Sequence, residues 1–314
     1  RRRRLTLLAA FSIPTFMMLR SQFLAAVMQQ RELAITLWRQ TWPMAIGVLA
    51  LLGFQLVDSA FIARLGTAPL AAQSFTFPLS FLIIGIQVGM GIAIAALISR
   101  ALGAGEQARA KRLSSLVLIA GGAVIAVLAV ALWLLQVPLF QLLGADETAL
   151  TYIRAYWGPQ LFSAWLGALL YFMYSVFRAH GDTRMPGKMM VLSSLINLAL
   201  DPLLIFGVGG WEGWGLPGAA WATAVAFFVG LLLTGAKLRR CQWATMDDIG
   251  QEAVRSWRPF TGIAAPAMVS QLMPPLAAML AIAAVAGLGD TQVAAWGLAS
   301  RLETLSLMVI LAMT

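Results

Sequence analysis

Two aspartates, Asp58 and Asp201, are the strongest candidates for chemistry because each lies inside a long apolar stretch. These stretches run from Ala45 to Ile62 and from Met189 to Val208, in a chain of which only 11% of residues are charged. If the stretches cross a membrane, each carboxylate would cost about 2.5–3.5 kcal/mol to insert at the bilayer centre. An intramembrane acid that is retained at this cost is expected to bind an ion, a proton or a partner group.

The composition predicts such a membrane protein. Mean hydropathy is +0.83 and 60% of residues are hydrophobic. Apolar stretches of about 20 residues, the length a helix needs to cross a bilayer, recur along the chain. We therefore predict an all-α, polytopic membrane fold with eight visible transmembrane helices, at residues 41–63, 73–99, 113–137, 153–177, 187–208, 216–236, 260–287 and 293–314.

Lysine and arginine are unevenly distributed between alternate loops. The loops after the second, fourth and sixth spans hold twelve of them, whereas the loops after the first, third, fifth and seventh hold only Arg64 and Arg154. By the positive-inside rule, the first group and the amino terminus are expected to be cytoplasmic, in a chain of the inner membrane. The net charge of +9 is then a topology signal, and no basic patch with interleaved aromatic residues favours nucleic acid. Trp157, Trp211 and Trp214 are expected to be anchors at the outer interface.

The thiol and imidazole content is too small for metal or redox chemistry. One cysteine, Cys241, cannot form an internal disulfide or a thiolate cluster, and one histidine, His180, lies in a predicted loop. We therefore expect no cofactor and no metal beyond a coupling ion.

A weak internal repeat divides the chain into lobes. A shift of 223 positions lays Pro43 on Pro266 and Leu65-Gly66 on Leu288-Gly289, so the seventh span repeats the first. We assign 1–30 to an N-terminal extension, expected to be artefactual or disordered rather than a signal peptide. We assign 31–240 to a first six-helix lobe, 241–258 to a cytoplasmic inter-lobe loop, and 259–314 to the start of a truncated second lobe. Asp58 falls opposite Ala281, so ion chemistry is expected in the first lobe.

The spacing from the outer turns places several polar residues at one depth. Asp58 precedes Gly66 by eight residues, Asp201 precedes Gly209 by eight, and Thr223 follows Gly215 by eight. At about 1.5 Å per residue, all three lie roughly 12 Å below the outer turns. Asn197 shares a helix face with Asp201, and Gln55 lies one turn before Asp58. These five side chains are therefore predicted to converge.

Carboxylate, amide and hydroxyl oxygens suit either Na⁺ or a shared proton. A plainer alternative remains open, in which Asn197 and Asp201 cap the backbone that Pro202 opens. Pro43 is placed either in the first turn of its helix or at a kink that could act as a hinge.

The chain resembles a known family at several motifs. They are Pro43 followed by Asp58 in Leu-Val-Asp-Ser-Ala-Phe, Arg-Ala-His-Gly-Asp-Thr-Arg-Met-Pro at 178–186, Asn-Leu-Ala-Leu-Asp-Pro at 197–202, and Gly-Leu-Pro-Gly-Ala-Ala-Trp-Ala-Thr at 215–223. Together they are similar to the multidrug and toxic compound extrusion (MATE) family, with closest similarity to its DNA-damage-inducible F branch. The resemblance covers about residues 31–314.

The resemblance implies a monomeric twelve-helix antiporter of two six-helix lobes, exporting cationic or amphipathic drugs in exchange for Na⁺ or H⁺. Asp58, Asn197, Asp201 and Thr223 match the cation site of the first lobe, and Pro43 matches the proline at which the first helix bends. The seventh span offers Gln271 and no acid, so no second-lobe cation site is expected. Met173, Met268, Gln271 and Met273 are candidates for the substrate cleft.

Two other classes of protein compete with this interpretation. A lipid-linked oligosaccharide flippase could share the architecture, but it would need several basic residues in its cleft. An intramembrane aspartyl protease is suggested by Gly287-Leu288-Gly289-Asp290. The repeat places that Asp290 on a short outer turn, facing water rather than Asp58, which argues against an enzyme.

Overall fold

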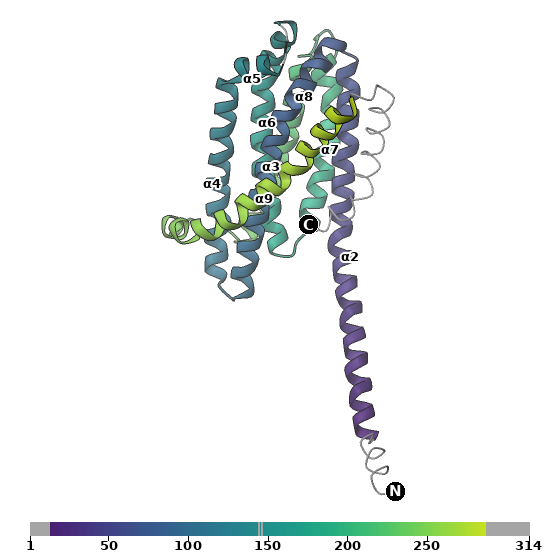
Figure 1. Cartoon of the computed structure of the whole chain (residues 1–314), viewed down its shortest axis with the longest axis vertical. Coiled ribbons are helices and arrows are strands. Elements are labelled where there is room, and N and C mark those ends of the chain that lie inside the picture. The colour runs from purple at the N-terminus through teal and green to yellow at the C-terminus, as the bar shows by residue number, and fades with distance from the viewer. Residues whose placement is uncertain (1–12, 144, 146, 287–314) are drawn as a thin grey trace.

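The computed structural model describes residues 13–143, 145 and 147–286, and within them it is a bundle of helices (Figure 1). The described chain has no β-strand, only an isolated bridge between Val208 and Trp211. The helices, in chain order, are α2 (Ile13–Ala63), α3 (Thr67–Gly103), α4 (Gln107–Leu134), α5 (Gln136–Leu142), α6 (Glu147–Ala179), α7 (Arg184–Phe206), α8 (Leu216–Cys241) and α9 (Ile249–Ala286).

Six of these helices contain a segment long and apolar enough to cross a membrane, which confirms the all-α polytopic fold. The segments are Thr41–Ala63, Ala68–Gly103, Gln107–Leu134, Glu147–Ala179, Arg184–Phe206 and Leu216–Cys241. They coincide with the first six predicted spans, although several begin earlier or end later. The helix α9 covers the predicted seventh span, and the eighth, 293–314, lies outside the described residues.

The segments on either side of the predicted first lobe are more helical than we predicted. The helix α2 begins at Ile13, so its first turns extend well beyond the bundle before the first span starts (Figure 1). The helix α9 begins at Ile249, inside the segment 241–258 that we predicted as a loop. Its first turns carry charged residues, among them Glu252 and Arg255, and this polarity led us to interpret the segment as a loop.

The short helix α5 was not predicted, and it explains why Trp157 is not an interfacial anchor. The side chain of Trp157 is fully buried, at 0% exposure. Its indole nitrogen donates to the carbonyl of Leu132 at 3.3 Å, and its ring packs edge-on against Phe140 of α5, with ring centroids 5.2 Å apart. The indole is therefore satisfied by protein groups instead of lipid headgroups.

The lobe is arranged as a ring of helices around its interior. The helix α2 packs on α7, α7 on α8, α8 on α6 and α6 on α3, while α4 covers α3 and α6 from outside and α9 lies along α3. Figure 1 shows α9 crossing the bundle at an angle. The core between these helices is built from large apolar side chains, among them Ile94, Leu113, Phe172 and Phe177. The predicted acids lie on the α2 and α7 members of this ring.

Candidate cation site and its surroundings

The α7 and α8 side of the site is buried and hydrogen-bonded. Asp201 is 0% exposed and Asn197 is 2% exposed, on one face of α7. The amide nitrogen of Asn197 donates to the hydroxyl oxygen of Thr223 on α8 at 2.8 Å, and that hydroxyl donates to the carbonyl of Ala219 at 3.1 Å. The structure thus brings Asn197 and Thr223 together, with Asp201 one turn along α7.

A glycine contact allows the two helices to approach this closely. A Cβ atom placed on Gly218, in the first turn of α8, would lie 2.2 Å from the carbonyl oxygen of Leu204 on α7. The turn between the helices also donates to the last carbonyls of α7, from Trp214 to Leu204 at 2.8 Å and from Gly215 to Ile205 at 3.1 Å. These contacts fix the register in which Thr223 meets Asn197.

Asp58 approaches from α2 and meets a residue that we did not predict, Gln73 of α3. The side-chain nitrogen of Gln73 donates to Oδ2 of Asp58 at a long 3.5 Å. Gln73 is 5% exposed, and Asp58 is partly buried. Asp58 also lies within electrostatic range of Asp201, so the two carboxylates repel each other when both are ionised. We refer to Asp58, Gln73, Asn197, Asp201 and Thr223 as the polar layer.

Tyr156 of α6 completes the surroundings of the polar layer. Its side chain is 4% exposed, and its hydroxyl donates to Oε1 of Gln160 at 3.0 Å. The same hydroxyl lies close to Gln73 and within electrostatic range of both aspartates. Sequence reasoning missed Gln73 and Tyr156 because the depth argument was applied only to the first, fifth and sixth spans.

Gln55 is placed differently from the other predicted members. It lies on α2 close to Asp58, but its side chain is exposed, whereas Asp58 is partly buried. Pro43 lies within the continuous helix α2 instead of at its start. The ring of a proline inside a helix removes one backbone hydrogen bond, so α2 is locally weakened in the first turn of its membrane segment, Thr41–Ala63.

The four predicted cleft residues have different surroundings. Met173 packs inside the first lobe, where the hydroxyl of Thr234 on α8 donates to its sulfur at 3.2 Å. Met268 packs on Gly89 of α3, at the interface between α3 and α9. Gln271 is partly buried, and Met273 is 56% exposed. Met173 is partly buried between α6 and α8, and its role in a substrate cleft stays a prediction.

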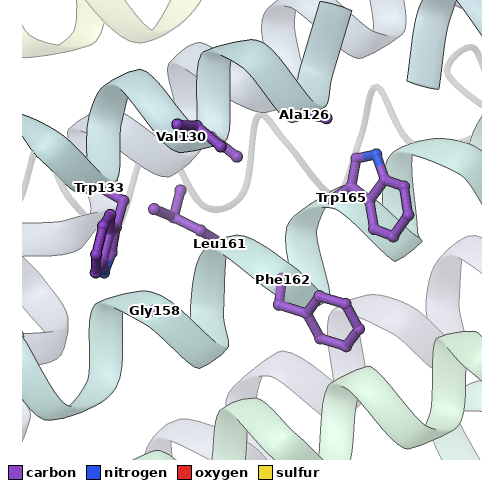
Figure 2. Close-up of a pocket in the computed structure, with 8 residues that line it drawn as sticks. Ala126, Val130, Trp133, Gly158, Leu161, Phe162 and Trp165 are labelled. Carbon is purple, nitrogen blue, oxygen red and sulfur yellow. The ribbon is translucent and has the colours of Figure 1, made fainter. Parts of the chain in front are cut away.

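An apolar cavity of about 290 Å³ lies between α4 and α6, and none of its lining residues belongs to the polar layer (Figure 2). Figure 2 shows Trp133 and Val130 of α4 facing Leu161, Phe162 and Trp165 of α6. Val130 and Trp133 are 56% and 49% exposed, so the cavity opens on the surface of the lobe. Its lining contains no acid that could bind a coupling ion.

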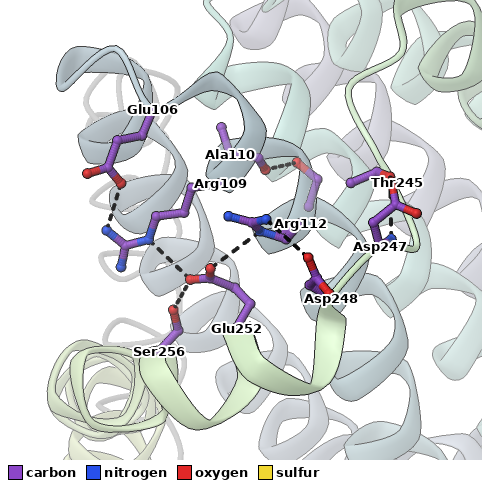
Figure 3. Close-up of polar contacts among 10 residues, drawn as sticks. Glu106, Arg109, Ala110, Arg112, Thr245, Asp247, Asp248, Glu252 and Ser256 are labelled. Atoms are coloured by element: carbon purple, nitrogen blue, oxygen red, sulfur yellow. Dashed lines mark hydrogen bonds and ion pairs between the residues drawn. The ribbon is translucent and has the colours of Figure 1, made fainter.

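A network of ion pairs attaches the start of α9 to the first lobe (Figure 3). The carboxylate of Glu252, 3% exposed, accepts from Arg109 at 3.1 Å and from the hydroxyl of Ser256 at 2.6 Å. It also lies 3.7 Å from the guanidinium of Arg112, which is 3.8 Å from Asp248. Burial by itself would raise the pKa of the Glu252 carboxyl, but Ser256 and Arg109 outweigh it and hold this pKa below its usual range.

A second contact attaches the connector between α8 and α9 to the loop between α6 and α7. The ring of Trp243 stacks on His180, with centroids 4.0 Å apart, and packs edge-on against Phe177. Burial lowers the pKa of His180, opposed in part by its hydrogen bond to the carbonyl of Val176. Burial alone would raise the pKa of the Asp182 carboxyl, but hydrogen bonds from Lys237 and from the Met185 amide hold it below its usual range.

A ring of membrane-length helices around buried acid, amide and hydroxyl groups is the arrangement of one lobe of a secondary transporter. The MatE family profile matches residues 43–203, which include both aspartates. The chain belongs to the MATE family, as the sequence motifs predicted, and it is a transporter chain rather than an enzyme. The protease hypothesis is therefore abandoned, and its Asp290 lies outside the described residues.

Individual relatives agree with this assignment. An FAD transporter of Shewanella oneidensis is 38% identical over 276 residues, covering 87% of this chain and 61% of that protein. The probable multidrug resistance protein YoeA of Bacillus subtilis is 29% identical, covering 80% of this chain and 55% of that protein. The structure of the Vibrio cholerae MATE transporter VcmN in the bent form superposes with a TM-score of 0.85 at 48% identity, covering 90% of this chain and 64% of that one.

The chain thus spans about three fifths of the length of the curated relatives that it matches. The first two are named for FAD transport and multidrug resistance, and a further relative, MepA of Staphylococcus saprophyticus, is named as a multidrug export protein. The similarity to the DNA-damage-inducible F branch stays a prediction.

Proposed function

We propose that this chain is the greater part of a cation-coupled antiporter that exports cationic or amphipathic small molecules across the cytoplasmic membrane. The observation that carries the proposal is the buried Asp201 beside Asp58, flanked by the hydrogen bond between Asn197 and Thr223. Two carboxylates that repel each other in a low-dielectric interior gain stability when a cation or a proton enters between them. The polar layer therefore supplies an energetic reason to bind H⁺ or Na⁺.

Coupling follows if ion and substrate favour opposite conformations. A ligand shifts a conformational equilibrium only by its difference in affinity for the two states. In our proposal, the cation favours the state in which α2 and α7 close around the polar layer, and the substrate favours the open state. Pro43 lies on α2 on the cytoplasmic side of Asp58 and supplies the weak point about which α2 bends. The relative VcmN has been solved in a form described as bent.

We also propose where the protein lies in the cell and what it binds. The asymmetry of Lys and Arg between alternate loops supports an inner-membrane location with the amino terminus in the cytoplasm. We propose a monomer with the lipid bilayer as its only obligatory partner, no nucleic acid, and no cofactor beside the coupling ion.

Dye export from cells tests the proposal directly. Cells expressing the full-length gene are loaded with a fluorescent cationic dye, and export is driven separately by a Na⁺ gradient or a pH gradient. Wild type is expected to export under one of the two gradients, and Asp58→Asn and Asp201→Asn are expected to lose gradient-driven export. Asp247→Asn, in the exposed connector, is the matched control and should export normally. Normal export by both site variants would refute the coupling role of the aspartates.

A second substrate class is favoured by one relative. The Shewanella protein that shares 38% identity over 87% of this chain is described as an FAD transporter. A flavin dinucleotide is anionic, so it would use the polar layer only for coupling and would need other groups for recognition. Export of FAD from cells expressing the full-length gene, measured by flavin fluorescence of the medium beside dye export, separates the two classes. FAD export that is lost in Asp58→Asn, without dye export in wild type, would replace the drug assignment.

A further inference from the structure

Two buried oxygen atoms of neighbouring side chains lack a hydrogen-bond donor among the described residues. They are Oδ1 of Asp58 on α2 and Oε1 of Gln73 on α3. The two side chains already touch through the hydrogen bond between Gln73 Nε2 and Asp58 Oδ2. A buried acceptor without a donor costs about 1–3 kcal/mol, and two of them in adjacent groups favour the entry of a hydrogen-bond donor or a cation between them.

The position of Gln73 is suited to this role. Its side chain is 5% exposed and lies two turns into α3, which begins at Thr67. Six residues of helix place it roughly 9 Å from the outer turn, close to the depth predicted for Asp58, Asp201 and Thr223. Gln73 therefore adds α3 to the ring of helices that contribute to the polar layer.

The amide group can serve both states of Asp58. A carboxylate accepts a hydrogen bond from the amide nitrogen, as in this structure. Rotation of the terminal amide by half a turn presents the oxygen instead, which can ligate Na⁺ or accept from a protonated carboxyl. The hydrogen bond at 3.5 Å is long, so little is lost when the amide turns.

We propose that Gln73 is a ligand of the coupling ion, whose amide oxygen and Oδ1 of Asp58 together hold the entering cation. The inference rests on the proposed function and adds a residue to its ion site. When the ion is a proton, it binds a carboxylate oxygen of Asp58, and the new O–H donates to Oε1 of Gln73. When it is Na⁺, both oxygens ligate it. The titratable groups in electrostatic range of Asp58 are Asp201 on α7 and Tyr156 on α6, and α8 contributes the hydroxyl of Thr223.

The test measures ion binding without relying on transport. Purified full-length protein is unfolded thermally while Na⁺ is exchanged for a large organic cation, and separately while pH is varied. An ion that binds the native state raises the melting temperature by mass action. Gln73→Met, nearly equal in size, should need about tenfold more of the ion that stabilises wild type; for protons this is a midpoint about one pH unit lower. Gln73→Glu adds an anionic oxygen and should shift the midpoint in the opposite direction.

A control variant and the ion midpoints distinguish a Gln73 that binds the ion from a Gln73 that only stabilises the fold. Gln87→Met, on the same helix and about 21 Å further along it, should leave the ion midpoint unchanged. A structural role for Gln73 would lower the melting temperature of both Gln73 variants but leave their midpoints at the wild-type value, which would overturn the proposal. A wild type whose melting temperature responds to neither ion would also overturn it. If the ion midpoint shifts as expected but wild type exports neither dye nor FAD, the ion site stands and the proposed transport function fails.

Discussion

Gly187 of α7 lies directly against the carbonyl group of Pro43 in α2. A Cβ atom at position 187 would be 2.2 Å from the carbonyl oxygen of Pro43 and 3.2 Å from its Cβ atom. The nearby Gly47 makes a similar approach, since a Cβ there would be 3.2 Å from the Cα atom of Gly187. At the proline that weakens α2, the backbones of α2 and α7 are thus in close contact, so movement of α2 must open or close this contact.

We expect Gly187→Ala to separate α2 from α7 and to destabilise the closed lobe. The clash is with backbone, which cannot rotate away, so overpacking should cost about 1–3 kcal/mol, set against up to about 1 kcal/mol gained in helix propensity. Gly53→Ala is the matched control, because a Cβ there meets nothing within 4 Å. Thermal unfolding of the purified full-length protein should show a lower melting temperature for Gly187→Ala only. Equal melting temperatures for the two variants would mean that α2 and α7 do not pack in this way.

The hydrogen bond between Asn197 and Thr223 should stabilise the pair of helices α7 and α8. Thr223→Val keeps the shape of the side chain but removes the hydroxyl, which accepts from Asn197 at 2.8 Å. Interhelical hydrogen bonds in membranes are worth about 0.6–2 kcal/mol, so we expect a loss of that size in the free energy of unfolding. Thr223→Ser should restore most of it. Chemical unfolding in detergent checks the difference, and a serine variant as unstable as the valine variant would assign the loss to packing of the methyl group.

The sequence predicts how deep a residue lies along its helix better than it predicts which way the side chain points. The depth of Asp58, Asp201 and Thr223 follows from helical rise, and the six spans follow from the length of apolar stretches. The direction of a side chain around its helix depends on packing against helices far away in the chain, which a single sequence does not reveal. The contact between Met173 and Thr234 of α8 is an example, because these residues are 61 positions apart in the chain.

Two contacts were not predicted because the ends of helices were placed at the wrong residues. The predicted second span began at residue 73, so Gln73 was placed at a membrane edge, whereas α3 begins at Thr67 and carries it inside. The pairing of Glu252 with Arg109 joins residues 143 positions apart, in segments that were both interpreted as solvated loop. No local pattern marks such a pair.

His180 should make its stacking contact with Trp243 sensitive to acid. Burial lowers the pKa of His180 in the folded protein, so the unfolded chain binds the proton more readily. The stability that neutral His180 contributes is therefore fully present above its ordinary pKa of about 6.5 and is lost as the pH falls below it. His180→Phe keeps a ring to stack on Trp243 but cannot be protonated. Melting temperatures compared at neutral and mildly acidic pH should fall less in this variant than in wild type, and parallel falls would exclude His180 as the acid-sensitive group.

Glu252 should carry more stability than any other acid in the network that attaches α9. Its carboxylate is 3% exposed and is shared by Arg109, Arg112 and Ser256, whereas the carboxylate of Glu106, which also pairs with Arg109, is 43% exposed. Exposed pairs contribute about 0–1 kcal/mol, and removing one partner of a buried pair costs about 3–5 kcal/mol. Because Arg109 is 22% exposed, we expect an intermediate loss of about 2 kcal/mol for Glu252→Gln and less than about 1 kcal/mol for Glu106→Gln.

Acid should remove the same contribution in wild type. The pKa of Glu252 is held below its usual range in the folded protein, so its stabilising effect is present above the ordinary glutamate pKa of about 4.3 and is lost as the pH falls through the lower, folded value. Glu252→Gln should therefore be less stable than wild type at neutral pH and should approach it in acid, while Glu106→Gln should follow wild type throughout. Thermal unfolding across this pH range measures both differences. A difference between Glu252→Gln and wild type that does not shrink in acid would show that the glutamine disturbs the packing of α9 on the lobe, and that the ion pairs themselves contribute little.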